Sequence, residues 1–304
     1  MQVALRNFIQ KYKERVDREI ENELARRMDE VADLSPHLIP ILTAMKELSV
    51  GGKRLRAMLT ILGYELSGQE VNDEVIKAAA MMELFHLGLL IQDDFMDKDT
   101  LRRGVKTIIA RYEDRHVGNF VSMLAGDYTF GWGIEIISGL NSPISNSQII
   151  NAMRVWGKYF TRVGYGQTLD GLEVADEKTI LQILELKSGE YSCVLPLVLG
   201  ATLGGADQKL ITNLEKYGME LGWVFQLRDD WLGVWGITDQ TGKPAGQDKK
   251  GKVTFATMYG KDATEAAIKE HMNLALEIVA GLQGQSSQAD LMCMLVEWMG
   301  TREN

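Results

Sequence analysis

The chain has 304 residues, 45% of them hydrophobic, which is enough for one large core or two fused ones. Its 33 basic and 42 acidic residues give a net charge of -9 with no basic stripe, so nucleic acid is not expected as a partner. Charge or glycine interrupts every apolar stretch before the roughly 20 residues that a membrane span needs. No transmembrane segment is therefore expected.

Proline and cysteine usage narrows the class of protein further. Only five prolines occur, which favours a mainly helical chain. Cys193 and Cys293 lie in apolar helical surroundings without metal-ligand spacing, so we interpret them as reduced core residues. Residues 1–18 are charged throughout, and no signal peptide is predicted. An all-α, cytoplasmic protein is expected.

The predicted elements are a series of helices. Apolar residues at four-residue spacing predict an amphipathic helix over residues 5–30, and Ser35-Pro36 is typical of a new helix start. Further helices are predicted over residues 53–66, 71–97, 148–173, 176–204, 209–234, 262–280 and 287–300. A kink is expected at Pro196, and residues 239–252 are predicted to be a loop. No linker is evident, so residues 1–304 are predicted to form a single domain.

Two acidic runs, residues 93–97 and 229–233, end apolar helical segments, where bare carboxylates are costly unless something neutralises them. In a helix Asp93 and Asp97 share one face, with Asp94 about 100° round from them. Two carboxylates one turn apart repel each other, and a divalent cation reverses that sign. The runs predict a site that holds Mg²⁺ against a diphosphate.

Alternative interpretations of these runs stay open. The first run could be a solvated acidic face, although the helix before it is strongly apolar. The second run, Asp229 and Asp230, has Gly233 where a third carboxylate would stand, and by itself it could be an N-cap or a surface pair. The presence of both runs in one chain favours the metal site.

Basic residues complement the carboxylates. Lys53 and Arg56 lie three apart at a predicted helix start, where free backbone N–H groups also favour an anion. Arg102 and Arg103 follow the first acidic run, and His86 lies two helical turns before Asp93 on nearly the same face. A solvated helix start and a satisfied core histidine are the alternatives for these residues.

These motifs together resemble the trans-isoprenyl diphosphate synthases, which elongate prenyl chains head to tail. The matching segments are GGKRLR at 51–56, QDDFMDKDTLRRG at 92–104, GQTLD at 166–170, KSGEY at 187–191, FQLRDDWLGVWG at 225–236 and TGKPAGQDKKGK at 241–252. The resemblance implies an all-α bundle around a deep central cavity, usually as a homodimer. It implies condensation of isopentenyl diphosphate with dimethylallyl, geranyl or farnesyl diphosphate.

The resemblance also implies a role for each site residue. About three Mg²⁺ ions would be held by Asp93, Asp94, Asp97, Asp229 and Asp230. The allylic diphosphate would be bound by Arg102, Lys187, Gln226, Lys243 and Lys252. Phe225 and Gln226 would line the region where the two substrates meet, and Gln167 would help to hold the metal-bound side. The diphosphate of isopentenyl diphosphate would be bound by Lys53, Arg56, His86 and Arg103.

The residues before the first acidic run are expected, by the same resemblance, to form the floor of the product cavity. Gly88 and Leu89 are not aromatic, and Phe85 lies about one helical turn deeper, a step close to one isoprene unit. With Gly88 leaving the upper level open, Phe85 becomes the predicted floor. Geranylgeranyl diphosphate is the expected product, with the farnesyl and farnesylgeranyl compounds as alternatives.

Two other functions are weighed against a synthase. A class I terpene cyclase also ionises a prenyl diphosphate, but it would normally lack the isopentenyl-side cations Lys53, Arg56 and Arg103. A non-catalytic subunit of a heteromeric synthase would tend to lose the acidic runs, and this chain keeps both. Consumption of isopentenyl diphosphate by the purified chain distinguishes a synthase from both alternatives.

Overall fold

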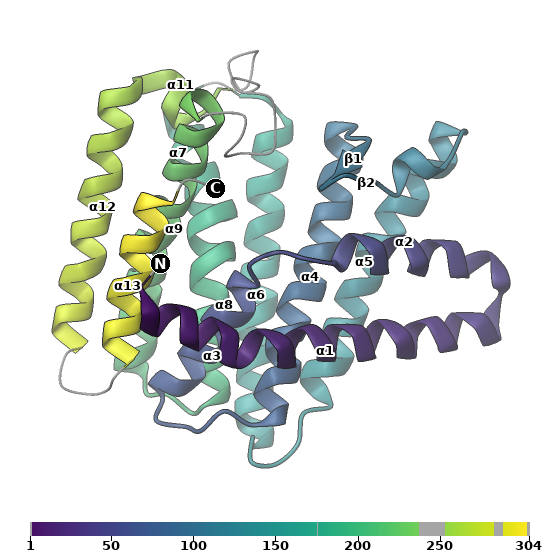
Figure 1. Ribbon diagram of the computed structural model, residues 1–304, viewed down its shortest axis with the longest axis horizontal. Coiled ribbons are helices and arrows are strands. Elements are labelled where there is room, and N and C mark those ends of the chain that lie inside the picture. The colour runs from purple at the N-terminus through teal and green to yellow at the C-terminus, as the bar shows by residue number, and fades with distance from the viewer. Residues whose placement is uncertain (1, 175, 237–252, 283–287, 303–304) are drawn as a thin grey trace. The chain divides into compact units, whose positions relative to one another are not determined.

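The computed structural model describes residues 2–174, 176–236, 253–282 and 288–302, and these are almost wholly helical (Figure 1). The all-α prediction is confirmed. No helix in these ranges is long and apolar enough to span a membrane. The chain divides into two compact units. Unit 1 is Met1–Ile9, Leu62–Glu70 and Arg154–Asn304, and unit 2 is Gln10–Ile61 and Val71–Met153. The single domain and the deep central cavity stay predictions.

The first half of the chain supplies the elements of unit 2. In order they are α1 (Val3–Leu34), the 3₁₀ turn η1 (Pro36–Leu38), α2 (Ile39–Ser49), α3 (Leu55–Leu66), α4 (Asp73–Asp97), β1 (Leu101–Arg102), β2 (Val105–Lys106), η2 (Ile109–Arg111) and α5 (Arg115–Ser138), of which α1 and α3 also contribute residues to unit 1. Side-chain caps fix where the two long helices begin. Asn72 accepts a hydrogen bond from the Val75 N–H at the start of α4, and Asp114 accepts from the His116 N–H at the start of α5.

Helices α4 and α5 pack at two glycines. A Cβ on Gly88 of α4 would lie 2.0 Å from Thr129 Oγ1, and one on Gly126 of α5 would lie 2.5 Å from Gln92 Cγ. Each glycine therefore receives a side chain from the other helix, which allows a closer approach than larger residues would permit. The pair of contacts fixes the register of α4, the helix that carries the first acidic run.

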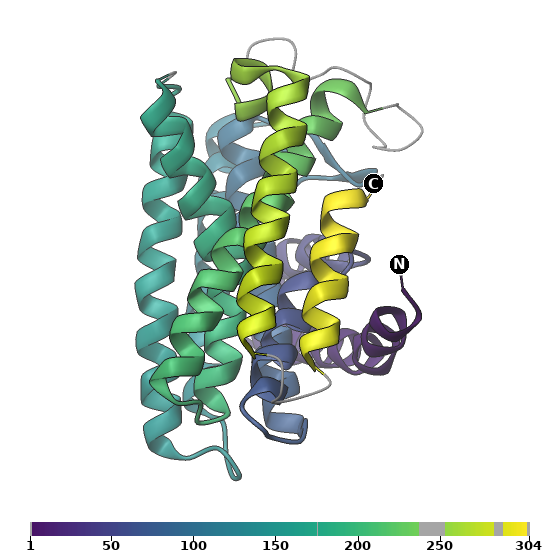
Figure 2. The same ribbon diagram turned by 90° about the vertical axis from the view of Figure 1, so that its left-hand side faces the viewer.

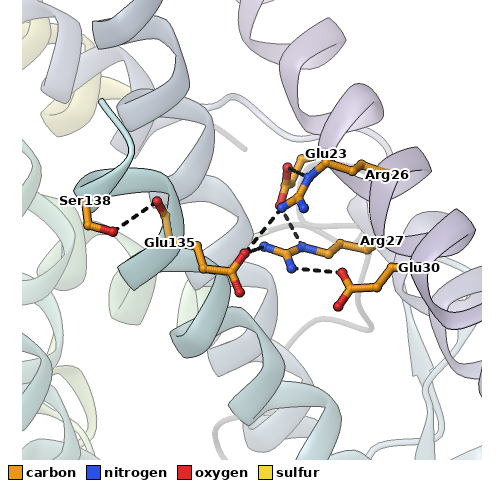
Figure 3. A network of polar contacts seen from close by, with 6 residues as sticks. All are labelled: Glu23, Arg26, Arg27, Glu30, Glu135 and Ser138. Carbon is orange, nitrogen blue, oxygen red and sulfur yellow. Dashed lines mark hydrogen bonds and ion pairs between the residues drawn. The ribbon is translucent and has the colours of Figure 1, made fainter. Parts of the chain in front are cut away.

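An ion-pair network joins α1 to α5 (Figure 3). The Arg27 guanidinium, whose side chain is 4% exposed, lies at its centre. Its partners are the carboxylates of Glu23 at 2.8 Å, Glu30 at 3.1 Å and Glu135 at 2.6 Å. Because three carboxylates surround one nearly buried cation, the network holds α1 against α5 more firmly than an exposed pair would.

The second half of the chain supplies most of unit 1. Its elements are α6 (Asn146–Gly171), which begins in unit 2, then α7 (Glu177–Ile183), η3 (Leu184–Val194), α8 (Leu195–Leu203), α9 (Gln208–Trp235), α11 (Phe255–Tyr259), α12 (Lys261–Leu282) and α13 (Gln288–Thr301). Helices α12 and α13 run side by side (Figure 2), and both contact α9. The buried Tyr217 hydroxyl of α9 donates to the Met292 carbonyl of α13 at 2.9 Å.

The predicted helix over residues 176–204 departs most from its expected geometry. Within it the chain changes from α7 to the π-helix η3 and then to α8. The expected kink at Pro196 stays a prediction. Pro196 occupies the first turn of α8, where its missing N–H costs nothing. The irregular segment thus lies on the KSGEY motif, and π-helical turns are frequent at functional sites.

Candidate active site

The first acidic run occupies the last turn of α4. Asp93 is 32% exposed at its side chain and Asp94 only 2%. The helix ends at Asp97, because Lys98 adopts a left-handed conformation with φ of 60°. Asp93 and Asp97 are one helical turn apart, as the sequence predicts, and Asp94 faces the interior of unit 2.

A short hairpin after α4 brings a cation back to this run. Arg103 and Gly104 have φ of 52° and 79°, which is typical of the tight turn that joins β1 and β2. Arg102 Nη2 consequently lies 2.7 Å from Asp94 Oδ1 and 3.8 Å from Asp93 Oδ2. The sequence analysis did not predict this hairpin, although an Arg-Gly pair between short strands is a recognisable turn signal.

The inner carboxylate of the run has spare capacity to bind a cation. Asp94 Oδ2 is buried and has no hydrogen-bond partner among the described residues. Burial raises the pKa of Asp94, and the Arg102 hydrogen bond opposes that rise. A buried carboxylate oxygen of this kind suits Mg²⁺, which takes one or two protein carboxylates and completes its shell with substrate phosphates and water. Within the described residues, no three acidic, histidine or cysteine side chains converge as a ready-made metal site.

Cations gather around His86 in the same unit. The Arg103 guanidinium lies beside Gly52, with Nη1 3.2 Å from the position of a Cβ there. Burial, followed by the charges of Arg56 and Arg103, lowers the pKa of His86 well below its usual value. His86 is therefore neutral at neutral pH within a positive environment. Lys53, three residues before Arg56, is exposed. The binding of a diphosphate by these residues stays a prediction.

The loop before α3 is held by charges that the sequence analysis did not single out. Arg54 has a left-handed φ of 52°, and its side chain is 9% exposed. It donates to Asp17 Oδ1 at 2.6 Å and to the Ser49 carbonyl at 2.8 Å, and it lies 3.8 Å from Glu83. Because Arg54 sits between Lys53 and Arg56, this anchorage fixes the segment that presents both cations.

The second acidic run lies near the end of α9, at a pocket of about 120 Å³ within unit 1. Both polar and apolar side chains line the pocket. The polar ones are Asp170, Lys187, Ser188, Gln226, Asp230 and Thr254, and the apolar ones are Ile180, Ile183, Leu184, Val253 and Phe255. Asp229 is 43% exposed at its side chain, whereas Asp230 is buried. The lining thus combines polar and apolar side chains, as a diphosphate with a hydrocarbon tail would require.

Side chains from three helices are connected at this pocket. Ser188 donates to Gln226 Oε1 at 2.6 Å, and Gln226 Nε2 donates to Asp230 Oδ1 at 2.8 Å. Lys187 Nζ lies 2.6 Å from Asp170 Oδ2 of α6. The structure therefore brings together the predicted Lys187, Gln226 and Asp230. It also adds Asp170, the last residue of the GQTLD motif, which the sequence analysis quoted without giving it a role.

A backbone contact sets the position of this group. A Cβ on Gly222 of α9 would lie 2.3 Å from Gly189 Cα and 2.7 Å from the Ser188 carbonyl of η3. The two helices thus approach backbone to backbone, which only glycine permits. Ser188 is consequently close enough to hydrogen-bond with Gln226 one turn further along α9.

The remaining predicted residues have different surroundings. Phe225 lies under the Arg302 guanidinium, 4.3 Å from the ring centroid, and Gln167 is not among the residues that line the pocket. Lys243 and Lys252 lie outside the described residues, so their predicted roles stay predictions. Asp93, Asp94 and Asp97 belong to unit 2, whereas Asp229 and Asp230 belong to unit 1.

The predicted chain-length residues pack against α5. Phe85 is fully buried and meets Phe130 edge to face, with ring centroids 5.5 Å apart. Leu89 is half-buried. The predicted role of Gly88 in leaving the product cavity open stays a prediction. The missing Cβ of Gly88 points at Thr129, so the glycine makes room for a neighbouring helix.

The site combines carboxylates, cations and the Gln226 amide, which is hydrogen-bonded to Ser188 and to Asp230. Such a combination on an all-α scaffold is typical of an enzyme that acts on anionic substrates. The sequence profile of the family described as "Polyprenyl synthetase" matches residues 40–290. Geranylgeranyl diphosphate synthase of Saccharolobus solfataricus is 30% identical over 224 residues, which are 71% of this chain and 65% of that protein. The geranylgeranyl diphosphate synthase of Methanosarcina mazei is 32% identical over 262 residues, 80% and 77% of the two chains.

Two further proteins extend these comparisons. Geranylfarnesyl diphosphate synthase of Aeropyrum pernix is 33% identical over 241 residues, 76% of this chain and 70% of that protein. The geranylgeranyl pyrophosphate synthase of Corynebacterium glutamicum, crystallised with isoprenyl diphosphate and magnesium, has a TM-score of 0.83 at 24% identity, covering 97% and 98% of the two chains. The structural likeness establishes the fold. The chain belongs to the polyprenyl synthetase family, and it is a prenyltransferase.

Proposed function

We propose that this prenyltransferase condenses isopentenyl diphosphate with an allylic diphosphate and releases all-trans geranylgeranyl diphosphate. The names of two of the three relatives support this product, and the third supports a product one isoprene unit longer. The observation that carries the proposal is the buried oxygen of Asp94, beside Arg102 and a cluster of cations. A site that removes a diphosphate needs both a metal ligand and compensating positive charge.

Mg²⁺ is the proposed cofactor, with about three ions per site. Its ligands are proposed to be Asp93, Asp94, Asp97, Asp229 and Asp230. When bound, Mg²⁺ stabilises the negative charge that develops on the departing diphosphate. Arg102 and Lys187, at present paired with Asp94 and Asp170, have the charge and position to bind the same diphosphate. Lys243 and Lys252 are proposed to add to them.

The cluster around His86 binds the second substrate. Arg56, Arg103 and Lys53 supply positive charge for the diphosphate of isopentenyl diphosphate. Because His86 is neutral, it can donate a hydrogen bond without adding repulsion among the cations. Ionisation of the allylic C–O bond leaves a carbocation, and the isopentenyl double bond attacks it. The tertiary cation that results loses a proton, and the released diphosphate is the proposed base. The residues around the reacting carbons must exclude water, which would trap the cation.

Phe85 is the proposed floor of the product cavity, with Leu89 above it. Its burial against Phe130 makes it a rigid boundary. Phe85→Ala should therefore lengthen the product by one isoprene unit, as read by chromatography of the dephosphorylated products. An unchanged product length would remove Phe85 from this role.

A homodimer in the cytoplasm is the proposed state of the protein. Helix α5 exposes a stripe of apolar side chains at helical spacing: Phe120, Met123, Leu124 and Ile134. A second copy of the chain would cover this stripe. The interpretation of Cys193 and Cys293 as reduced core residues supports a reducing compartment. Sedimentation of the wild-type protein and of Phe120→Asp tests the dimer, since a charge in the stripe should shift the wild-type mass to that of a monomer.

Product sizing with radiolabelled isopentenyl diphosphate and each allylic primer in turn tests the reaction. The wild-type chain with Mg²⁺ should consume isopentenyl diphosphate and yield geranylgeranyl diphosphate. A terpene cyclase would consume the allylic diphosphate alone. A chain inert by itself but active with a second protein would be a subunit of a heteromeric synthase. Either result would overturn the proposal.

A further inference from the structure

Arg302, the residue after α13, contacts the second acidic run of α9. Its Nη2 donates to Asp229 Oδ1 at 2.6 Å and to the Phe225 carbonyl at 2.9 Å. The Arg302 side chain is 7% exposed, whereas that of Asp229 is 43% exposed. The cation of this pair is therefore nearly withdrawn from water while the carboxylate stays accessible.

Two more contacts orient the guanidinium. Its carbon lies 4.3 Å from the centroid of the Phe225 ring, a cation–π geometry. Arg228 Nε donates to the Arg302 carbonyl at 2.8 Å. Residues 225, 228 and 229 lie on one face of α9, so Arg302 is held from three directions. An arginine fixed in this way keeps its carboxylate partner in a defined orientation.

The attachment of α13 to α9 does not depend on this ion pair. The buried face of α13 is apolar, with Met292, Leu295, Val296 and Met299 inside. A separate buried hydrogen bond joins the two helices, from the Tyr217 hydroxyl to the Met292 carbonyl. Burying the Arg302 guanidinium costs free energy that docking alone would not require. A local role at Asp229 accounts for it.

We propose that Arg302 is a positioning residue for the metal-binding carboxylate of Asp229. Carboxylates that bind metals are commonly held by hydrogen bonds from outside the coordination shell, and loss of such a partner weakens metal binding. Asp230, the other carboxylate of the run, is held by Gln226. Each carboxylate of the second run thus has its own positioning partner. This inference rests on the proposed function, in which Asp229 binds Mg²⁺ against a diphosphate.

Calorimetric titration of inorganic diphosphate at a series of Mg²⁺ concentrations tests the role of Arg302 without turnover. Arg302→Gln should raise the Mg²⁺ concentration needed for half-maximal diphosphate binding by about 10-fold to 100-fold. Arg302→Lys should recover part of that loss, because the charge returns without the planar fork. In an Asp229→Asn background, Arg302→Gln should change the Mg²⁺ requirement little, since the carboxylate that it orients is gone.

Tyr217→Phe is the matched control, because it removes a buried link between α9 and α13 away from the aspartates. It should lower the melting temperature and leave the Mg²⁺ requirement at the wild-type value. If Arg302→Gln behaves like Tyr217→Phe, Arg302 only docks α13 and the inference is wrong. If Arg302→Gln does not fold, the same titration of Arg302→Lys decides, since an unchanged Mg²⁺ requirement there contradicts the inference. Turnover of the wild-type protein tests the proposed function separately.

Discussion

The two acidic regions of this chain hold their carboxylates in different ways. On α4, Asp94 is buried and pairs directly with Arg102 from the hairpin that follows the helix. On α9, Asp230 is held by the amide of Gln226, which in turn is held by Ser188. In the first region the negative charge of Asp94 is therefore compensated by the positive charge of Arg102. In the second region the buried carboxylate of Asp230 is oriented by neutral groups.

This difference separates two tasks that a diphosphate site has to combine. Under the proposed function, Asp94 would exchange Arg102 for a metal ion as substrate arrives, and Arg102 would turn to the substrate phosphates. A carboxylate held by an amide keeps its orientation without giving up a charge. We infer that the first region responds to the substrate, while the second provides a fixed surface.

The largest expected effect is the loss of activity when either region loses a carboxylate. Asp94→Asn should lower kcat/KM by on the order of 1000-fold and Asp229→Asn by about 100-fold, since Asp94 is more buried and its Oδ2 lacks another partner. Initial rates at saturating Mg²⁺ measure both. The exposed Asp29→Asn controls for net charge. A greater loss at Asp229 would reverse the order of importance that we give to the two regions.

Glycine contacts position both acidic helices, and their replacement should destabilise the fold. Gly222→Ala should lower the free energy of unfolding by about 3 kcal/mol, because its Cβ would meet backbone atoms of η3. Gly88→Ala should cost about 2 kcal/mol, because the atom nearest to its Cβ belongs to the Thr129 side chain and not to the backbone.

Helical glycines with open surroundings provide matched controls for these two variants. Nothing lies within 4 Å of a Cβ at Gly164 of α6 or at Gly131 of α5. Alanine at either position should leave stability unchanged or raise it by about 0.4–1 kcal/mol. Urea denaturation measures all four variants, and equal effects at Gly222 and Gly164 would contradict the close contact.

In the ion-pair network between α1 and α5, replacement of the buried arginine should lower stability more than replacement of the exposed one. Arg27→Met should lower the free energy of unfolding by about 2 kcal/mol, because it leaves the half-buried Glu23 without its nearest buried cation. Arg26→Met is the control, since Arg26 is 53% exposed and its ion pairs should contribute less than about 1 kcal/mol. Chemical denaturation compares the two. Equal losses would show that burial does not govern this network.

The smallest expected effect concerns pH. The pKa of His86 is lowered on folding, so between its folded value and its unfolded value near 6.5 the unfolded chain binds a proton that the folded chain does not. Stability should therefore fall as pH drops below 6.5, by up to about 1.4 kcal/mol per pH unit from this group. His86→Asn should lose less stability than the wild type between pH 7 and pH 5.5, as measured by urea midpoints. Parallel curves would mean that the pKa of His86 is not lowered on folding.

Helix positions were largely predictable from the sequence, because apolar periodicity reports the buried face of a helix. The predicted helix over residues 209–234 corresponds to α9, Gln208–Trp235. Its start follows the cap at Asp207, which accepts from the Leu210 N–H at 2.8 Å. The predicted helix over residues 262–280 likewise corresponds to α12, Lys261–Leu282.

The π-helix and the hairpin could not be predicted in the same way. Apolar periodicity does not report which carbonyl each N–H contacts, so residues 176–204 gave no sign of a π-helix before Pro196. The strands of the hairpin have two residues each, too few for an alternating pattern. Both features nevertheless lie on predicted motifs, KSGEY and LRRG.

Long-range partners within the site were also beyond sequence reasoning. The two acidic runs and the cations were predicted because motif and spacing are local. Asp170 pairs with Lys187 from 17 positions away, and Arg302 pairs with Asp229 from 73 positions away. Residues that far apart in the sequence leave no repeating pattern, so such pairs become visible only in the folded structure. The contact of Gly88 with Thr129 was not predictable either, since a glycine does not indicate which neighbour fills its space.

The Thr129 side chain fills the space between α4 and α5 that a side chain at position 88 would need. The size of the residue at one position therefore limits the size of the residue at the other. Thr129 Oγ1 is further tied by its hydrogen bond to the Gly126 carbonyl at 2.8 Å, so it has little freedom to turn aside. A bulkier residue at position 88, introduced to shorten a prenyl product, would first have to displace α5. Engineering of product size at this level therefore calls for a compensating pair, such as Gly88→Ala with Thr129→Gly, because a single substitution should destabilise the packing of α4 against α5.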